Sequence, residues 1–247
     1  MLENKKAVIF DLDGSLVDSM WIWPEVDIQY MKKYHLTQPE NFHKAIEGMS
    51  YTETAQYFLD TFPSLKCTLD DVREEWKDMT LELYTTKVPL KPGAREFLEN
   101  MHDRGILMGI ATSNARELVD AALKALHVEG FFASVRTSCE VAAGKPAPDV
   151  YLKVAEDLHV KPEHCLVFED VPKGIEAGLN AGMSVCAVDD EFSRPDEAEK
   201  KRLADYFIHD YYDIKNHTYE TCRIRSTRYR GEQPVKTGMQ PVLCNEV

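Results

Sequence analysis

Residues 6–14 read KAVIFDLDG, a short apolar run that ends in two aspartates and a glycine. A continuous apolar run of this length is typical of a buried strand in a parallel sheet. Because successive side chains of a strand point to opposite faces, Asp11 and Asp13 point to the same side. Gly14 allows the chain to turn sharply after them. The stretch therefore predicts a strand that presents two carboxylates at its carboxyl end, where ligands gather in α/β sheets.

Similar apolar runs recur along the chain and alternate with segments of helical pattern. The further strands are expected at 106–111, 165–168, 183–188 and, more weakly, 206–208. The helices of this part are expected at 92–104, 115–127, 148–158, 172–181 and 195–204. Strand and helix alternate, so we predict an α/β fold with a parallel sheet covered by helices on both faces.

Residues 18–87 interrupt this alternation, because they contain helical patterns and no convincing strand. The patterns cover 24–34, 40–47, 52–61 and 68–87. The segment includes all three tryptophans, Trp21, Trp23 and Trp76. We expect a small four-helix unit inserted after the first strand, above its carboxyl end, where it can act as a lid.

The end of the chain, about 214–247, differs in composition from the rest. It carries more basic than acidic residues and no helical periodicity. The pattern predicts a basic C-terminal tail that packs on the acidic body or is partly disordered, and its role is not apparent from the sequence.

Composition excludes several classes of protein. The formal net charge of −13 argues against nucleic acid or an anionic membrane as the main partner. No apolar run approaches the ~20 residues of a membrane span, and the apolar run at the N-terminus is too short for a signal peptide. The six cysteines are scattered, without a C-x-x-C pair, which predicts reduced thiols in a cytoplasmic protein and no clustered zinc ligands.

A second acidic pair, Glu169-Asp170, follows the expected strand 165–168. Taken alone, Asp170 is as well explained by helix capping, and the first pair alone is compatible with a solvated turn or another metal-binding D-x-D. The loop after Asp11 does not match an EF-hand, because Leu16 stands where that loop needs glycine. Two such pairs on adjacent strand ends would bring four carboxylates together, which requires a cation. Hard oxygen ligands of this kind suit Mg²⁺.

Two further motifs are weaker when taken singly. Thr112-Ser113-Asn114 closes an apolar strand and opens a helix, so its hydroxyls and the helix N–H groups form either an anion site or an ordinary helix cap. Lys145 lies in a proline-containing loop before a helix, where a lone lysine is usually a solvated charge.

Together and in order, the motifs resemble those of the haloacid dehalogenase-like hydrolase superfamily. They read DLDGS at 11–15, TSN at 112–114, GKPAPD at 144–149 and VFEDVPKGIEAG at 167–178. The last motif and the early helical insertion resemble the β-phosphoglucomutase-like branch of small-molecule phosphatases. The resemblance implies a Rossmann-like core made of residues 1–17 and 88–213, with a helical cap at 18–87.

The resemblance also implies roles for the candidate residues. Asp11 would be the nucleophile and Asp13 the general acid and base, whose pKa the surrounding like charges are expected to raise. Mg²⁺ would be bound by Asp11, Asp170 and the backbone carbonyl of Asp13, with help from Glu169. The phosphoryl group would be held by Thr112, Ser113, Asn114 and Lys145.

The cap is expected to decide the substrate. Gly48-Met49-Ser50-Tyr51 resembles the cap specificity loop of the family, and Gly48, Ser50, Tyr51 and Trp23 are the candidate specificity residues. Sugar mutases of this branch usually carry arginine where Tyr51 stands and histidine where Trp23 stands, which argues against a phosphoglucomutase. The two aromatic side chains either contact a flat or apolar substrate or belong to the packed interior of the helices.

The expected function is therefore Mg²⁺-dependent hydrolysis of a small phosphorylated metabolite through an aspartyl-phosphate intermediate. Three alternatives stay open: a β-phosphoglucomutase-like phosphotransferase, a dehalogenase, and a non-catalytic module that binds a phosphorylated ligand. We expect a monomer or weak dimer, with neither nucleic acid nor membrane as a partner.

Overall fold

The computed structural model describes residues 1–223. Residues 224–247 and the side chain of His43 lie outside the described residues, so the predicted basic tail is for the most part not placed. In the described part, seven strands form one sheet in the order β3-β2-β1-β4-β5-β6-β7. The strands are β1 Ala7–Phe10, β2 Leu107–Thr112, β3 Ser134–Thr137, β4 Cys165–Glu169, β5 Ser184–Val188, β6 Tyr206–Ile208 and β7 Glu220–Thr221.

The sheet is parallel except for β7, which pairs antiparallel with β6. The central strand β1 lies between β2 and β4, with Phe10 opposite Ile110 on one side and Phe168 on the other. This arrangement confirms the predicted α/β fold and brings the carboxyl ends of β2, β1 and β4 to neighbouring positions.

Helices cover both faces of the sheet, and the side chains of β1 show why. Val8 and Phe10 belong to an apolar cluster with α5 and α6, whereas Ala7 and Ile9 belong to a cluster with α7, α8 and α9. The helices of this part are α5 Ala94–Asp103, α6 Arg116–Ala125, α7 Asp149–Asp157, α8 Pro172–Asn180, α9 Glu197–Leu203 and α10 Tyr212–Asn216, with short 3-10 helices at Glu129–Phe131, Ser138–Glu140, Pro162–His164 and Arg194–Asp196.

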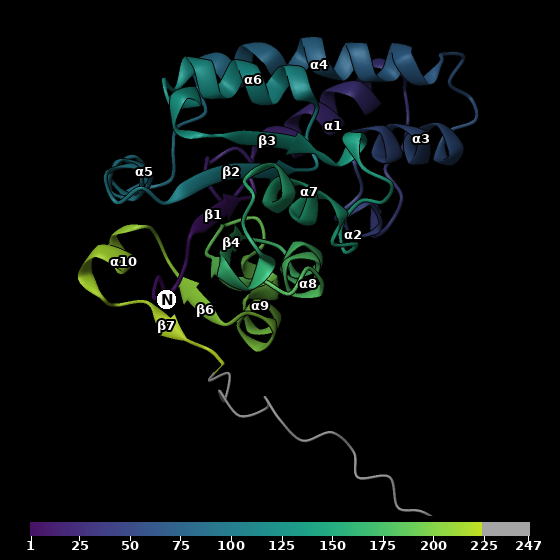
Figure 1. Ribbon diagram of the computed structural model, residues 1–247. Coiled ribbons are helices and arrows are strands. Elements are labelled where there is room, and N and C mark those ends of the chain that lie inside the picture. Colours follow the sequence, from purple (N-terminus) through teal and green to yellow (C-terminus); the bar gives the residue numbers. More distant parts are fainter. Residues whose placement is uncertain (224–247) are drawn as a thin grey trace, which may run out of the picture.

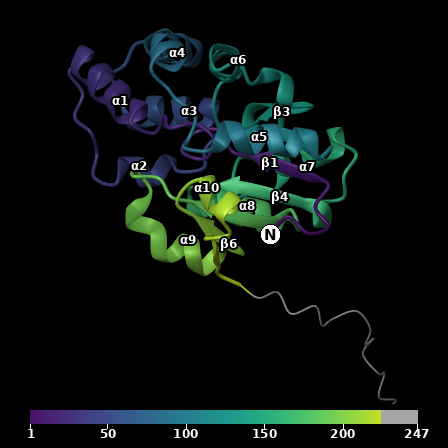
Figure 2. The same ribbon diagram turned by 90° about the vertical axis from the view of Figure 1, so that its left-hand side faces the viewer.

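Four helices lie between β1 and α5 in sequence, where a helical insertion was expected. They are α1 Ile22–Lys33, α2 Phe42–Ile46, α3 Tyr51–Thr61 and α4 Leu69–Thr86. Their interior is aromatic, with the ring of Phe58 5.3 Å from those of Tyr30 and Trp76. Figures 1 and 2 show these helices on one side of the molecule, with α4 running beside α6.

The chain enters and leaves this helical unit through two adjacent segments. The backbone N–H of Asp18 donates to the carbonyl of Pro89 at 2.9 Å, and that of Lys91 donates to the carbonyl of Leu16 at 2.9 Å. The unit is thus attached to the sheet at one place, directly after the two aspartates that follow β1.

The structure differs from the sequence-based expectation at two places. Strand β3 was not predicted, because its middle residues Val135 and Arg136 are only half-buried and the strand forms an edge of the sheet. Residues 214–223, for which no regular structure was expected, include the end of α10 and all of β7. No helix of the described part is both long and apolar enough to span a membrane.

Candidate active site

The predicted acidic residues meet where three neighbouring strands end. Asp11 directly follows β1, Thr112 ends β2 and Glu169 ends β4. The rings of Phe10 and Phe168 stack beneath them with centroids 5.4 Å apart. The buried aromatic layer thereby fixes the two strand ends from which Asp11 and Glu169 project.

Lys145 joins two of the carboxylates. Its Nζ lies 2.6 Å from Asp11 Oδ1 and 2.6 Å from Glu169 Oε1, and all three side chains are buried. Burial alone would lower the pKa of Lys145, but the charges of Asp11 and Glu169 outweigh it and raise the pKa. Lys145 is therefore a buried cation shared by two acids rather than the solvated charge that its loop position alone suggested.

Glu169 is held on all sides. The hydroxyl of Tyr151 donates to its Oε1 at 3.1 Å, and the backbone N–H groups of Asp170 and Val171 donate to its Oε2 at 2.8 and 3.1 Å. Both carboxylate oxygens of Glu169 therefore already accept hydrogen bonds, and Oε1 also contacts Lys145 Nζ at 2.6 Å.

A divalent cation fits beside these residues. Carboxylate oxygens of Asp11, Glu169 and Asp170 lie within 4.8 Å of one another. Oδ1 of Asp170 accepts from Ser15 Oγ at 3.1 Å, but its Oδ2 is buried and has no hydrogen-bond partner among the described residues. Buried polar atoms are nearly always partnered, and an oxygen-only donor set matches Mg²⁺.

Burial is the main cause of the shifted pKa values of Asp11 and Asp170. Burial raises the pKa of Asp11 to about 8, with Lys145 acting against the shift and Glu169 and Asp13 adding to it. Burial, followed by the charges of Glu169 and Asp11, also raises the pKa of Asp170 well above its usual range. A bound cation would favour the charged forms and oppose both shifts.

Asp13 is surrounded by hydrogen-bond donors. Ser19 Oγ donates to Oδ1 at 2.5 Å, Tyr84 also donates its hydroxyl to Oδ1, and Asn114 Nδ2 donates to Oδ2 at 2.9 Å. Burial raises the pKa of Asp13, and these three hydrogen bonds oppose the rise. The direction of the shift agrees with the sequence analysis, but burial is the main cause rather than neighbouring negative charge.

The Thr112-Ser113-Asn114 segment lies beside Asp13. Thr112 Oγ1 accepts from the backbone N–H of Asn114 at 3.1 Å, and Asn114 Oδ1 accepts from the backbone N–H of Ala115 at 2.7 Å. The carbonyl of Ser113 accepts from the backbone N–H of Tyr51 at 2.8 Å. Asn114 thus orients Asp13, and Ser113 joins the core to the start of α3.

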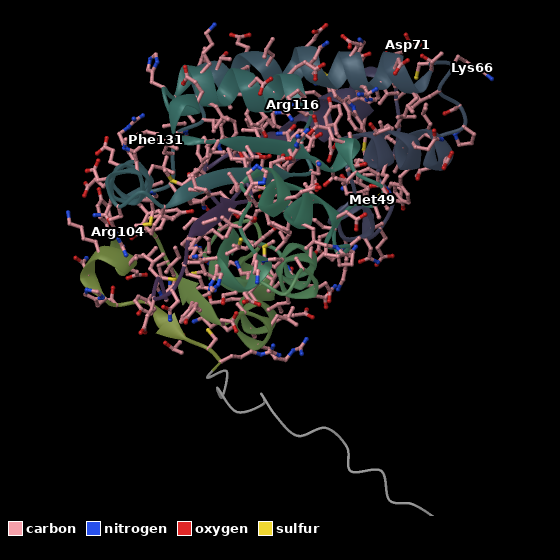
Figure 3. The ribbon with its side chains drawn as sticks, viewed as in Figure 1. Met49, Lys66, Asp71, Arg104, Arg116 and Phe131 are labelled. Atoms are coloured by element: carbon pink, nitrogen blue, oxygen red, sulfur yellow. The ribbon has the colours of Figure 1, made fainter. Side chains whose placement is uncertain are left out.

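The loop before α3 closes over the core. Gly48 has a φ of +78°, and a Cβ there would lie 2.8 Å from the carbonyl oxygen of Lys145, so only glycine allows this approach. Ser50 caps α3 by accepting from the backbone N–H of Glu53 at 3.2 Å. Its hydroxyl is therefore used within the helix rather than toward a ligand. Met49, between them, is labelled in Figure 3 beside α2.

A cavity of about 220 Å³ connects the acids with the helical unit. All candidate residues named from the sequence except Ser50 line it: Asp11, Asp13, Trp23, Gly48, Tyr51, Thr112, Ser113, Asn114, Lys145, Glu169 and Asp170. The rings of Trp23 and Tyr51 lie 6.4 Å apart in the aromatic packing of the helical unit, and both residues also line the cavity.

Several residues of the site were missed from sequence. Asp27 and Trp76 line the cavity from α1 and α4, and Tyr84 and Tyr151 contact the acids from α4 and α7. Their helical spacing showed only that they belong to amphipathic helices. Ser19, which donates to Asp13, was also missed. Its closeness to Asp13 along the chain was the one signal that could have identified it.

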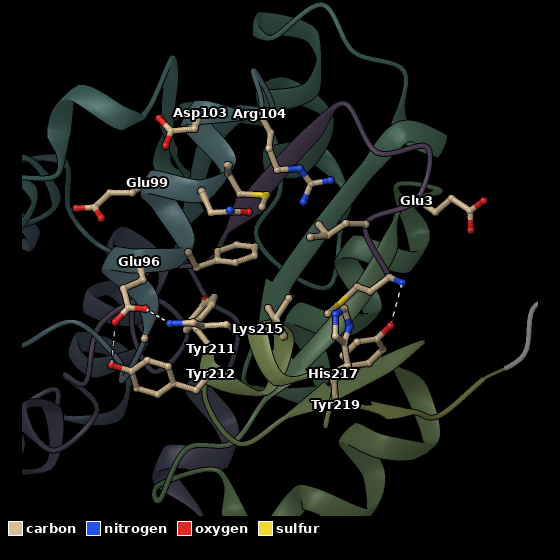
Figure 4. A pocket seen from close by; sticks show the side chains of 17 residues that line it. Glu3, Glu96, Glu99, Asp103, Arg104, Tyr211, Tyr212, Lys215, His217 and Tyr219 are labelled. Carbon is tan, nitrogen blue, oxygen red and sulfur yellow. Dashed lines mark hydrogen bonds and ion pairs between the residues drawn. The ribbon is translucent and has the colours of Figure 1, made fainter.

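A second, larger cavity of about 770 Å³ lies away from these acids, between the N-terminus, α5 and residues 211–219. Figure 4 shows Lys215 and Tyr212 directed toward Glu96, with Lys215 Nζ 2.8 Å from Glu96 Oε2. The ion pair of Lys215 with Glu96 is exposed and contributes little stability, and none of the catalytic candidates lines this cavity.

Comparison with known proteins identifies the same family that the sequence motifs resemble. The model of the haloacid dehalogenase-like hydrolase family matches residues 8–188. The chain is 30% identical over 178 residues to a phosphorylated carbohydrates phosphatase of Thermotoga maritima, which covers 72% of this chain and 82% of that protein. It is 34% identical over 217 residues to the mitochondrial (DL)-glycerol-3-phosphatase 1 of Arabidopsis thaliana, covering 84% and 71%.

Solved structures show the same fold. CbbY from Rhodobacter sphaeroides in complex with phosphate superimposes with a TM-score of 0.74 at 19% identity, covering 85% of this chain and 96% of that one. A β-phosphoglucomutase from Clostridium difficile gives a TM-score of 0.73 at 20% identity, covering 87% and 95%.

Proposed function

The chain belongs to the haloacid dehalogenase-like hydrolases, and on that premise we propose that it hydrolyses a small phosphorylated metabolite through a phosphoaspartate formed on Asp11, with Mg²⁺ as cofactor. The observation that carries this proposal is the meeting of Asp11, Glu169, Asp170 and Lys145 in one cavity, with Asp170 Oδ2 unpartnered among the described residues.

Asp11 is the group that attacks phosphorus. Water attacks a phosphate dianion poorly, because the negative charge of the phosphate repels an incoming nucleophile. A covalent intermediate divides the reaction into two easier steps. The Asp11 carboxylate forms a bond to phosphorus while the bond to the alcohol oxygen breaks. Lys145, 2.6 Å from Asp11 Oδ1, favours the charged form of this carboxylate, orients it and offsets the charge of the incoming phosphate.

Asp13 is the group that moves protons. It donates a proton to the departing alkoxide, and it then accepts one from the water that hydrolyses the phosphoaspartate. Ser19, Tyr84 and Asn114 hold its carboxyl group through hydrogen bonds. Since Tyr84 belongs to α4 of the helical unit, this unit supplies one of the three hydrogen bonds that hold Asp13.

Mg²⁺ would be held by Asp11, Asp170 and the backbone carbonyl of Asp13, with Glu169 nearby. When bound, it supplies positive charge that stabilises the negative charge of the phosphoryl group. Thr112, Ser113 and Asn114 lie beside Asp13 at the end of β2, and we assign the phosphoryl oxygens to Thr112 and Ser113 together with Lys145.

The same family membership suggests how the chain is divided into domains. We propose that residues 1–17 and 88–213 form the catalytic core and that 18–87 form a cap over it. We further propose a cytoplasmic location, which the scattered thiols without disulfide bonds in the described part support, and a monomer or weak dimer.

The proposal is tested by hydrolysis of p-nitrophenyl phosphate with Mg²⁺. We expect turnover by the wild-type protein, its loss in EDTA with recovery on added Mg²⁺, and its loss in Asp11→Asn. The matched control is Asp78→Asn, on an exposed position of α4. Turnover by Asp11→Asn at the wild-type rate would contradict the assignment of Asp11 as the nucleophile. Chloride release from 2-haloacids without phosphatase activity would favour a dehalogenase.

A further inference from the structure

The part of the cavity that the helical unit forms is lined by apolar and aromatic side chains. We call this part the apolar wall, and it consists of Trp23, Val26, Ile46, Met49, Tyr51 and Trp76. The rings of Trp23 and Trp76 lie 6.4 and 6.0 Å from the ring of Tyr51. Tyr51 and Trp76 are buried, so packing within the helical unit holds these rings in place before a ligand binds.

Hydroxyl groups of the helical unit that border the cavity donate within the unit itself. The hydroxyl of Tyr51 donates to the backbone carbonyl of Arg73 at 3.0 Å. The hydroxyl of Thr54, another lining residue, donates to the backbone carbonyl of Ser50 at 3.1 Å. The protons of both hydroxyls are therefore used, and a polyol placed against the apolar wall would give up hydrogen bonds to water with few replacements.

Charged side chains that line the cavity are also engaged by the protein. Asp27 makes an interaction of its own, and Glu47 Oε1 accepts from the backbone N–H of Lys173 at 3.4 Å. Among the described lining residues, the one basic side chain is Lys145, whose Nζ lies 2.6 Å from each of two catalytic carboxylates. A second anionic group on the substrate would thus lie against the apolar wall without a cation to receive it.

The apolar wall adjoins the residues to which we assign the phosphoryl group. The backbone N–H of Tyr51 donates to the carbonyl of Ser113 at 2.8 Å, and Thr112 and Ser113 line the same cavity. A phosphomonoester whose phosphoryl group lies at these two residues would have its alcohol part beside the apolar wall. The cavity of about 220 Å³ has room for a compact group such as a single ring.

We infer that the alcohol part of the substrate is uncharged and presents a flat apolar ring to Trp23, Tyr51 and Trp76. Such a ring gains from the burial of its apolar surface and from contacts with the aromatic side chains. The inference rests on the proposed function, because it describes the leaving group of the phosphomonoester that Asp11 attacks. It makes Trp23 a specificity-determining residue and distinguishes this chain from an enzyme for sugar or polyol phosphates.

The test compares wild-type kcat/KM, with Mg²⁺ present, for phosphate esters in which a CH₂ group joins a ring to the ester oxygen. The set is benzyl phosphate, cyclohexylmethyl phosphate, 4-carboxybenzyl phosphate and glucose 6-phosphate. We expect benzyl phosphate to exceed glucose 6-phosphate by roughly a hundredfold and 4-carboxybenzyl phosphate by roughly tenfold, with cyclohexylmethyl phosphate between benzyl phosphate and glucose 6-phosphate. This comparison needs no variant, so it decides the matter even if substitutions impair folding.

Trp23→Gln then assigns the preference to the apolar wall. The ratio of kcat/KM for benzyl phosphate to that for glucose 6-phosphate should fall by roughly tenfold in Trp23→Gln and be retained in Trp23→Phe, which keeps a ring. The matched control is Trp21→Gln, because Trp21 is exposed and does not line the cavity. The ratio is the readout because Trp23 also packs 6.1 Å from the ring of Tyr84, which holds Asp13, and a change there lowers the turnover of both esters alike.

Two results overturn the inference while hydrolysis of p-nitrophenyl phosphate persists. One is that glucose 6-phosphate or 4-carboxybenzyl phosphate is used as well as benzyl phosphate or better. The other is an unchanged ratio in a Trp23→Gln protein that is folded by circular dichroism. Absence of any hydrolysis, p-nitrophenyl phosphate included, overturns the proposed function and the inference with it.

Discussion

Replacing Gly174 with alanine should destabilise the protein, although alanine is the better helix former. Gly174 lies in the first turns of α8, where the change alone would add up to about 1 kcal/mol of stability. A Cβ at this position, however, would lie 1.7 Å from Glu169 Oε1 and 2.0 Å from its carboxyl carbon. Because Glu169 is fully buried, its carboxylate has nowhere to go without leaving its partners.

The magnitude follows from those partners. Overpacking of this kind costs about 1–3 kcal/mol, and each lost hydrogen bond to a charged group costs about 1.5–3 kcal/mol. Glu169 accepts such bonds from Lys145, Tyr151 and two backbone N–H groups. Losing one of them and subtracting the helical gain gives a net destabilisation of about 3 kcal/mol, which lowers the melting temperature of a chain of this size by roughly 6–12 °C.

Urea unfolding followed by circular dichroism measures this change, provided that the m-values of the variants agree. Gly130→Ala is the matched control, since nothing lies within 4 Å of a Cβ built there. A Gly174→Ala protein as stable as the wild type would show that α8 or Glu169 moves freely, and it would refute the packing argument.

Three other predictions concern the metal site, an ion pair and a hydrogen bond to Asp13. Mg²⁺ at one hundred times its dissociation constant should raise stability by about 2.7 kcal/mol, and Asp170→Asn should remove most of the thermal shift; an equal shift in the variant contradicts the metal assignment. The Arg136 guanidinium holds the pKa of Asp157 at about 2, below its usual 3.8, so this pair adds stability that is present above about pH 4 and lost as the pH falls through the folded value. Asp157→Asn should therefore lower the unfolding free energy by about 1 kcal/mol at neutral pH, with allowance for exposure, and by much less near pH 2; a difference independent of pH would count against the pair. Tyr84→Phe removes a hydrogen bond to Asp13 and should lower kcat roughly 10–100-fold with little change in KM, whereas an unchanged kcat would leave Tyr84 without a role in positioning.

The parts of the fold that the sequence predicts are those with a clear local pattern of apolar residues. The buried apolar runs of β1, β2, β4 and β5 end in turn or polar residues, so their position is visible without a partner. Strand β3 is short and half-exposed at an edge, and β7 comprises two exposed residues. Their identity as strands comes from pairing with neighbours, which a local pattern does not contain.

The residues of the candidate site likewise divide into those that the sequence predicts and those that it does not. Asp11, Glu169 and Asp170 were found because strand ends converge in any parallel sheet. Asp27 and Tyr84 were missed because their contacts depend on how the helical unit is oriented over the sheet, which no spacing along the chain specifies. Ser50 shows the reverse case, since its place in the motif made it a specificity candidate, whereas in the structure its hydroxyl caps α3.

The two hydrogen-bonded segments that connect α1–α4 to the sheet have an evolutionary consequence. Since the pairing of Asp18 with Pro89 and of Lys91 with Leu16 is between backbone atoms, it places few demands on the residues beyond it. The ends of the inserted unit stay together whatever lies between them, so a chimera carrying foreign helices at this junction would retain the sheet and its acids. The reaction, which depends on the sheet, and the substrate selectivity, which depends on the inserted helices, can then change at different rates during the evolution of one gene.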